Sequence, residues 1–554
     1  MAPVGKLCLS LFISMKILLL FILIDLMLTY IPASGGIGVA LPYNLTFLGW
    51  LGLMLIILAL RYKNAELKAP RQPLLTAGSL LLLLPWLFEA CDNPGVWVLL
   101  GAVLLWLGLL RLSFTPRLKR QILLAVFVLA LGQALIALLQ AFCPHLAMQL
   151  YEYDWLRNHG RPYGIFQQVN LLASFLASGI GCGFLLLLTT RRTARIGLIV
   201  PGLGVLTFVL ALNQSRAGAI GAVVVIVALY AAAGRGRIMR AGAALGVMTL
   251  CAWAGWYITQ HVTVMVNGEP YLMARDYADS TRARWHILVI TWQMIMEKPW
   301  LGWGYGTFEY AFSRWVLAHP QPDYAYSSIV THPHNELLYM WFQGGVVALA
   351  GMLLLVTGWL LMLKNAWRHG RETAAFVLLV VPLLVHLNLE YPFYQSFVHF
   401  GLFILLLRLG VVEQPQPAQA CASLCRRVLC GIVALALIAF SAAGLYANQQ
   451  LTRLERSGLA GFPAPTPWYF ATQFERAKFD AMVALLIDYN RTHNEANLDK
   501  FMAQAQRWSL RHNDKNLWQS QIMIAQHRGD VATVARLRTQ YARLFPAAQI
   551  SSAP

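Results

Sequence analysis

The sequence predicts an all-α polytopic membrane protein with about 13 transmembrane helices, a long outer loop and a C-terminal helical domain. Hydrophobic residues make up 58% of the 554 residues, and charged residues only 12%, about half the charged share of soluble domains. Thirteen apolar runs each approach the ~20 residues that a helix needs to cross a bilayer. Their apolar residues are consecutive, whereas the strands of a membrane barrel alternate in polarity.

The apolar runs follow one another with short connections. They lie near residues 10–31, 41–60, 74–91, 95–110, 120–142, 168–190, 196–212, 215–233, 241–259, 335–363, 373–389, 396–412 and 428–447. The first run is long enough to span and has no convincing small-residue cleavage site. We therefore expect a retained helix and no cleaved signal peptide.

Basic residues set the expected orientation, because every second connection is rich in them. The connections near 32–40, 92–94 and 390–395 contain no Lys or Arg. By the positive-inside rule, the N-terminus lies in the cytoplasm, and the loops 143–167 and 260–334 lie outside. The formal net charge of +19 follows from this topology, so we expect no nucleic acid partner.

Composition divides the chain near residue 447. Residues 1–447 form the predicted transmembrane domain, whose outer loop 260–334 is too long, at about 75 residues, to be mere connection. Residues 448–554 contain no spanning run and show helical periodicity, as in Phe479/Met482/Leu485. This periodicity predicts a small outer helical domain that resembles tetratricopeptide helix pairs, although it has no clean repeat.

No metal site is expected. Most of the eight cysteines lie in or beside apolar runs, and the cluster Cys421, Cys425 and Cys430 contains no CxxC pair. Asp276 and Asp279 are interpreted as charges of a solvated loop.

Three outer segments carry polar residues that the membrane fold does not require. The first runs from Gly160 to Asn170 and leads into the sixth apolar run. The second is Asn213-Gln214-Ser215-Arg216-Ala217-Gly218, where two apolar runs meet. The third is the long loop, and the candidate residues of the three segments are Arg161, Gln168, Asn170, Arg216, Arg282, Arg284 and His334.

The arginines of these segments point to an anionic ligand. A guanidinium group is always charged and binds phosphate oxygens in a two-pronged fork. An arginine near a helix end can instead extend to lipid headgroups. Three arginines and a histidine on one side of the membrane favour a phosphorylated lipid substrate.

His334 opens the tenth apolar run after Pro333, so we expect it at a helix start near the interface. A histidine titrates near neutral pH and suits a general base that activates a hydroxyl. Two alternatives are a histidine that only satisfies local hydrogen bonds and a metal pair with His332. Nothing nearby completes a ligand set for the second alternative.

Glu390 and Tyr391 lie at the outer end of the eleventh apolar run, in the segment His386-Leu387-Asn388-Leu389-Glu390-Tyr391-Pro392. Ionisable groups in such positions tend to mark functional cavities. We expect these two residues to line an acceptor or sugar site.

The order of these motifs resembles the O-antigen ligase/polymerase superfamily over roughly residues 150–410. The matching motifs are Ser215-Arg216-Ala217-Gly218, Arg284 with Pro299 and Leu301-Gly302-Trp303-Gly304-Tyr305-Gly306, and His334-Asn335-Glu336-Leu337-Leu338 with Gly344-Gly345. The resemblance implies a multi-span, metal-independent glycosyltransferase that uses undecaprenyl-diphosphate-linked sugars.

Within that superfamily the chain looks most like bacterial protein O-oligosaccharyltransferases, the PglL-like pilin glycosylation ligases. Gln168-Val169-Asn170 is similar to their glutamine–asparagine motif, although Val169 replaces the usual proline, and Glu390-Tyr391-Pro392 resembles their glutamate–tyrosine–proline motif. The outer C-terminal domain also fits.

The resemblance implies roles for individual residues. Catalytic positions would be His334, Gln168 and Tyr391. The diphosphate would be bound by Arg216 and Arg284, with Arg282 as a substitute for Arg284. Further pocket candidates are Asn170, Arg161, Glu390 and Asn335.

The implied function is transfer of an oligosaccharide from undecaprenyl diphosphate to a Ser or Thr of a periplasmic or pilin-like protein. The enzyme would lie among the lipids of the bacterial inner membrane with its C-terminus in the periplasm, and it would need no cofactor. The alternatives are an O-antigen ligase with a lipid A-core acceptor, an O-antigen polymerase, and a transporter of the same lipid. Transporters often show internal repeats, and we find none between the two halves.

Overall fold

The computed structural model describes residues 29–33, 38–61, 70–88, 95–112, 114–190, 192–232, 237–273, 278–319, 329–413, 424–509 and 511–545. Within these ranges the chain is mainly helical, with one two-stranded sheet. Six of the described helices are long and apolar enough to cross a membrane, and five more are apolar but shorter. The predicted all-α polytopic membrane fold is confirmed, and the count of 13 spans stays a prediction.

Twelve of the predicted apolar runs coincide with helices, while most of the first run lies outside the described residues. The helices are α2 (Pro42–Arg61), α3 (Pro73–Leu83) continued by η2 (Leu84–Phe88), α4 (Gly95–Leu110), α5 (Pro116–Phe142), α7 (Val169–Thr189), α8 (Thr193–Asn213), α9 (Arg216–Ala232), α10 (Ile238–His261), α13 (Glu336–His369), α14 (Arg371–Leu378) with α15 (Val381–Leu387), α17 (Phe397–Leu409) and α18 (Leu424–Arg456). Cys421 and Asp276 lie outside the described residues, as do the side chains of Cys425 and Asp279.

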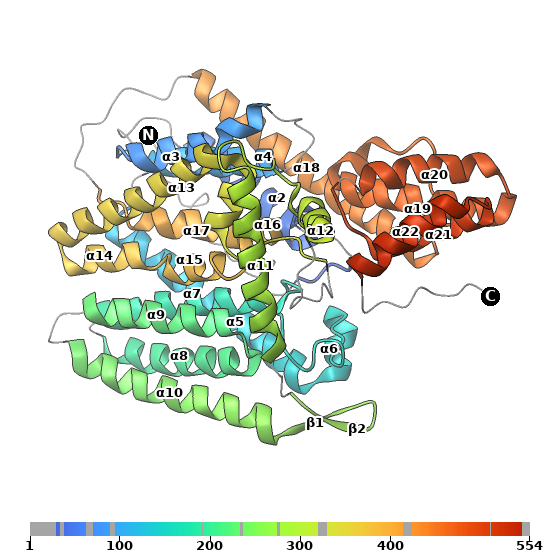
Figure 1. Cartoon of the computed structure of the whole chain (residues 1–554). Helices are drawn as coiled ribbons and strands as arrows, with labels where there is room; N and C mark the ends of the chain where they lie inside the picture. The colour runs from blue at the N-terminus through green and yellow to red at the C-terminus, as the bar shows by residue number, and fades with distance from the viewer. Residues whose placement is uncertain are drawn as a thin grey trace, which may run out of the picture.

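Helix α7 lies at the centre of the bundle, and almost all of its span is buried. It packs against α5, α8, α9 and α15, and Figure 1 shows α7, α9, α8 and α10 following one another in that order across the bundle. Gly183 permits this packing, because a Cβ there would lie 2.5 Å from the Phe127 ring. The candidate residues that precede α7 are therefore attached to the most buried of the six long apolar helices that the structure describes.

The eleventh predicted run is a broken helix. Residues 373–389 form two short helices, α14 and α15, separated by Leu379 and Val380. Pro382 lies in the first turn of α15 and has no N–H to continue the hydrogen bonds of α14. The short helix α16 (Pro392–Gln395) follows α15 at its outer end.

The two loops that are predicted to lie outside contain more structure than the sequence predicted. The first holds α6 (Pro144–Tyr151). The second begins with an antiparallel hairpin of β1 (Thr263–Val266) and β2 (Glu269–Leu272), which was not predicted although its Asn-Gly turn is a common hairpin signal. It continues with α11 (Ala278–Glu297) and α12 (Phe308–Ala318). Figure 1 shows α11 running across the direction of the spans.

Helix α13 is broken at Gly344 and Gly345, and the glycine-containing segment of the long loop packs into this break. Gly345 has φ +59°, and a Cβ there would collide with the Trp300 carbonyl. The carbonyls of Phe342 and Gln343 accept hydrogen bonds from Trp303 N at 2.7 Å and from Gly304 N at 3.0 Å. The segment after α11 thus fills the break and satisfies its backbone groups, which fixes the start of α13 against the long loop.

The last span continues as a helix to Arg456, nine residues beyond the predicted end of the apolar run. The remaining elements are η4 (Trp468–Gln473), α19 (Phe474–Thr492), α20 (Glu495–Trp508), α21 (Lys515–His527) and α22 (Val531–Leu544). Helices α19 and α20 form one packed pair and α21 and α22 another, as Figure 1 shows.

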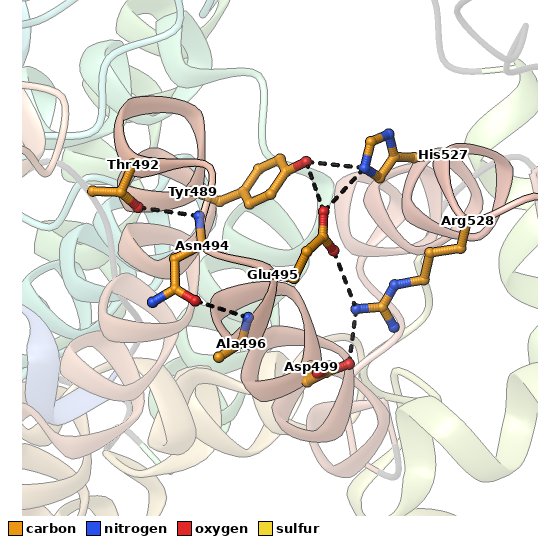
Figure 2. A network of polar contacts seen from close by, with 8 residues as sticks. All are labelled: Tyr489, Thr492, Asn494, Glu495, Ala496, Asp499, His527 and Arg528. Atoms are coloured by element: carbon orange, nitrogen blue, oxygen red, sulfur yellow. Dashed lines mark hydrogen bonds and ion pairs between the residues drawn. The ribbon is translucent and has the colours of Figure 1, made fainter.

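A polar network joins the two helix pairs. Figure 2 shows Glu495 on α20 between Tyr489, His527 and Arg528. Its Oε1 lies 3.2 Å from His527 Nε2, and Arg528 donates to Asp499 at 2.8 Å. These side chains are largely exposed, so each ion pair adds little to stability and serves mainly to orient α21 against α20.

Candidate functional site

The segment from Gly160 to Asn170 is held in place by buried amides of α5 and α8. Gln140 Oε1 accepts hydrogen bonds from the backbone N–H groups of Tyr163 and Gly164, at 3.0 and 2.8 Å. Asn213 Nδ2 donates to the Pro162 carbonyl at 2.8 Å, and Arg161 Nε donates to the Asn213 carbonyl at 3.0 Å. Arg161 therefore supports the segment, and its predicted place in the pocket stays a prediction.

Glu390 is the centre of the candidate site. Its carboxylate accepts a hydrogen bond from Arg284 at 2.7 Å, from Asn170 Nδ2 at 2.6 Å and from Gln168 Nε2 at 3.2 Å. Glu390 is only 7% exposed, and a carboxylate can be buried when a guanidinium and amides satisfy it in this way. One side chain thus joins the α7 entrance, α11 of the long loop and the connection after α15.

Gln168 and Asn170 are fixed in their positions by further contacts. Gln168 Oε1 caps α7 by accepting from Leu171 N at 2.5 Å, which is a standard role of a helix N-cap residue. Ser215 Oγ donates to Asn170 Oδ1 at 2.7 Å. The two amides therefore present their N–H groups to Glu390 with little freedom.

His334 lies beside this cluster in a left-handed backbone conformation with φ +59°. Burial, then the charge of Arg284 and the neighbouring His332, lower the pKa of His334 to about 4, against a small opposing effect of a hydrogen bond to the Leu389 backbone. Its buried Nδ1 has no hydrogen-bond partner among the described residues. A neutral imidazole with an unengaged nitrogen can accept a proton at neutral pH.

Behind His334 lies a second polar group that the sequence did not lead us to expect. His332 Nδ1 accepts a hydrogen bond from His334 N at 2.9 Å, and His332 Nε2 lies 3.4 Å from Glu336 Oε2. Tyr394 donates to Glu336 Oε1 at 2.7 Å. The spacing of four residues between His332 and Glu336 at a helix start was the available signal.

Tyr391 lies beside both histidines. Its ring stacks on His332 with a centroid distance of 4.8 Å, and the centroid distance to His334 is 6.2 Å. Burial raises the pKa of the Tyr391 hydroxyl, so the group stays protonated and can donate a hydrogen bond to a substrate oxygen.

A large hollow of about 2960 Å³ reaches this region. Most of its wall is apolar and comes from α2, α4, α5, α17 and α18, whereas His332, Glu336, Tyr391 and Tyr394 line a polar part of it. Arg284 and His334 are not part of the wall. Tyr391 therefore connects the hollow to the cluster around Glu390.

The remaining predicted residues have different surroundings. Arg216 is exposed and begins α9 directly after Ser215, the residue that contacts Asn170. Arg282 is exposed on α11, two residues before Arg284 and so on nearly the opposite side of the helix. Asn335 Oδ1 caps α13 by accepting from Leu338 N at 3.0 Å. The structure thus joins Gln168, Asn170, Arg284, Glu390, Tyr391 and His334, and it separates Arg282 from them.

Comparison with known proteins gives two family matches, and each matched range contains residues of this site. A family model described as O-antigen ligase matches residues 201–353, a range that includes Arg216, Arg284 and His334. A model described as the C-terminal region of a virulence factor membrane-bound polymerase matches residues 374–553, which include Glu390 and Tyr391. Together the two matches cover more than half of the chain.

A curated relative matches a shorter stretch. It is an O-antigen ligase of Salmonella typhimurium, 29% identical over 128 residues, which are 22% of this chain and 28% of the relative. The match thus spans little more than a quarter of the relative's length.

Proposed function

The chain belongs to the O-antigen ligase/polymerase superfamily, and we propose that it is a protein O-oligosaccharyltransferase. In this proposal it transfers an oligosaccharide en bloc from undecaprenyl diphosphate to a Ser or Thr of a periplasmic or pilin-like protein. The observation that carries the proposal is the cluster around Glu390, which holds Arg284 beside the neutral imidazole of His334.

Arg284 and Arg216 bind the diphosphate in this scheme. Their guanidinium groups neutralise the negative charge that develops on the diphosphate as the anomeric C–O bond breaks. Glu390 orients Arg284 through the 2.7 Å contact, and the amides of Gln168 and Asn170 hold Glu390. Because diphosphate is already a good leaving group, the scheme needs no metal or cofactor.

His334 is the general base of the scheme. Its unengaged Nδ1 takes the proton of the acceptor hydroxyl while the oxygen attacks the anomeric carbon. Tyr391, whose ring lies beside both histidines, donates a hydrogen bond to a substrate oxygen. The apolar wall of the hollow has the chemistry to hold the isoprenoid chain of the donor.

The proposed topology puts this reaction in the periplasm. The basic connections place the N-terminus in the cytoplasm and residues 448–554 in the periplasm, with residues 1–447 in the inner membrane. The cluster around Glu390 then lies at the outer ends of α7 and α15, where a donor in the outer leaflet can reach it.

Two other acceptor classes have specific support. The relative with 29% identity is named an O-antigen ligase, which favours a lipid A-core acceptor, and the second family model is described as a polymerase, which favours another lipid-linked glycan. The Gln168-Val169-Asn170 and Glu390-Tyr391-Pro392 motifs and the outer C-terminal helices favour a protein.

Purified protein in detergent tests the proposal. It is mixed with undecaprenyl-diphosphate oligosaccharide and, in separate reactions, with a Ser/Thr-containing pilin-type peptide, lipid A-core or no further acceptor. We expect the glycan mass on the peptide by mass spectrometry, and none with His334→Ala. Transfer to lipid A-core alone indicates a ligase, a lengthened donor indicates a polymerase, and no new glycosidic bond at all indicates a carrier.

A further inference from the structure

The hollow that reaches His332 continues into a polar chamber between the long loop and the C-terminal helices. The name outer chamber is used for the part of the hollow that is lined by Gly306, Glu309, Thr331, Ala471, Thr472, Gln473, Arg511 and His512. Its lining carries hydroxyl, amide and charged groups, whereas the rest of the hollow is mainly apolar. The outer chamber therefore suits a polar ligand, and it is continuous with the wall that contains Tyr391.

Gln473 lines the outer chamber and carries a buried, unsatisfied acceptor. The residue joins η4 to α19 and is 4% exposed. Its Nε2 donates to the Ala40 carbonyl at 3.3 Å, but its Oε1 has no hydrogen-bond partner among the described residues. Leaving a buried acceptor unsatisfied is destabilising, so this oxygen is a candidate to receive a ligand's hydrogen bond.

A short 3₁₀ helix connects Gln473 to the polar residues beside the reacting centre. Ala40 ends η1 (Gly38–Ala40), and Gly38 packs so closely on α16 that a Cβ there would lie 2.6 Å from the Tyr394 carbonyl oxygen. Tyr394 in turn donates to Glu336, the partner of His332. Gln473 is thus separated from the His332 group by η1 and Tyr394.

The walls of the outer chamber are fixed to the rest of the protein. Arg476 of α19 donates to Asn448 Oδ1 and to Glu455 on α18, each at 2.7 Å. On the opposite wall, Glu309 of α12 accepts from Asn513 N at 2.6 Å. A site whose walls are held in this way loses little entropy when a ligand binds.

We propose that the outer chamber binds the sugars of the lipid-linked donor that lie beyond the first sugar, with Gln473 Oε1 accepting a hydrogen bond from a sugar hydroxyl. The inference rests on the proposed function, because it assumes that the anomeric end of the glycan lies near His334 and Tyr391. Sugars offer many hydroxyl donors, and Thr331 and Thr472 add neutral hydroxyl groups to the same chamber. Donor length is then recognised by the C-terminal helices.

The test compares two donors. One is undecaprenyl diphosphate carrying N-acetylglucosamine, and the other is the same lipid carrying a trisaccharide extended from that sugar. We expect Gln473→Ala to raise the KM for the trisaccharide donor about tenfold, the effect of one hydrogen bond, and to leave the KM for the single-sugar donor within about twofold. Gln506→Ala, at an exposed position of α20, is the matched control and should change neither.

The single-sugar donor also reports whether the variant is folded. An equal change for both donors, no change for either, or a raised KM for the acceptor peptide alone overturns the inference. Wild-type protein that forms no glycosidic bond with either donor instead overturns the proposed function, and the inference with it.

Discussion

Glu390 and Arg284 form an ion pair of 2.7 Å although 106 positions separate them in the chain. Arg284 comes from α11 of the long loop, and Glu390 from the connection between α15 and α16. The pair therefore attaches the long loop to the membrane bundle where Gln168 and Asn170 also meet. It also determines which arginine of α11 faces the candidate site.

Replacing Arg284 tests that assignment. We expect Arg284→Ala to lower the kcat of glycan transfer by about 10²–10³-fold, which is the usual effect of removing one group that stabilises developing charge. Arg282→Ala, at the exposed position on nearly the opposite side of α11, should have a much smaller effect. A larger loss for Arg282→Ala would move the diphosphate site away from Glu390.

Removing the charge of Glu390 should misplace Arg284. Glu390→Gln keeps the side-chain shape but loses a charge-assisted hydrogen bond, which contributes about 1.5–3 kcal/mol. We expect kcat to fall about 10- to 100-fold while the amount of protein in the membrane stays unchanged. Glu372→Gln is the matched control, because Glu372 is exposed and lies 3.8 Å from each of its arginine partners. Equal kcat for the two variants contradicts the role of Glu390.

The pH dependence of transfer should reflect the low pKa of His334. Its pKa is lowered from 6.5 to about 4, so the imidazole is neutral and able to accept a proton over the whole range above pH 5. We expect kcat to stay nearly flat from pH 8 to pH 5.5 and to fall only nearer pH 4. A loss of half the activity near pH 6.5 would show that the base is an ordinary exposed histidine or another group.

The same shift has a consequence for stability. Between pH 6.5 and about 4 the unfolded chain binds a proton at His334 that the folded chain does not, so the folded state loses stability as the pH falls through this window. Arg284→Ala removes one cause of the lowered pKa of His334, so the remaining activity of this variant should begin to fall at a higher pH than in the wild type. An unchanged pH dependence in that variant contradicts the proximity of Arg284 and His334.

Gly345 tests the break in α13. Gly345→Ala puts a Cβ against the Trp300 carbonyl at φ +59°, and such backbone strain costs about 1–3 kcal/mol. We expect a lower melting temperature in detergent and weaker transfer, because the start of α13 carries His334. Gly246→Ala in α10 is the control, since nothing lies within 4 Å of a Cβ at that position. Equal melting temperatures for the two variants would contradict the role of the break.

Much of the fold follows from hydropathy alone. Solid apolar runs predict spanning helices because only helices and closed barrels satisfy their backbone hydrogen bonds in lipid, and barrel strands alternate in polarity. Helix α4 begins and ends at the predicted residues 95 and 110. The division of the eleventh run into α14 and α15 depended on Pro382, and the hairpin on Asn267 and Gly268. These are single-residue signals that an averaged apolar pattern hides.

The candidate site was predictable residue by residue but not in its contacts. The sequence pointed to Gln168, Glu390 and Arg284 because polar side chains close to membrane spans are costly and tend to mark functional sites. Their shared hydrogen bonds depend on how α7, α11 and α15 meet in space, which no local pattern records. Asn335, a predicted pocket residue, caps α13. Glu336 was not among the candidate residues because an acidic residue in a first helical turn is ordinary.

The most direct measurement is a structure of the wild-type protein, in lipid nanodiscs, with a non-hydrolysable undecaprenyl-diphosphate sugar. We predict that the phosphate oxygens contact Arg284 and Arg216, that the anomeric carbon lies beside His334 Nδ1, and that the isoprenoid chain enters the apolar hollow. A diphosphate bound elsewhere, with the Arg284–Glu390 pair and His334 untouched by the ligand, would contradict the account.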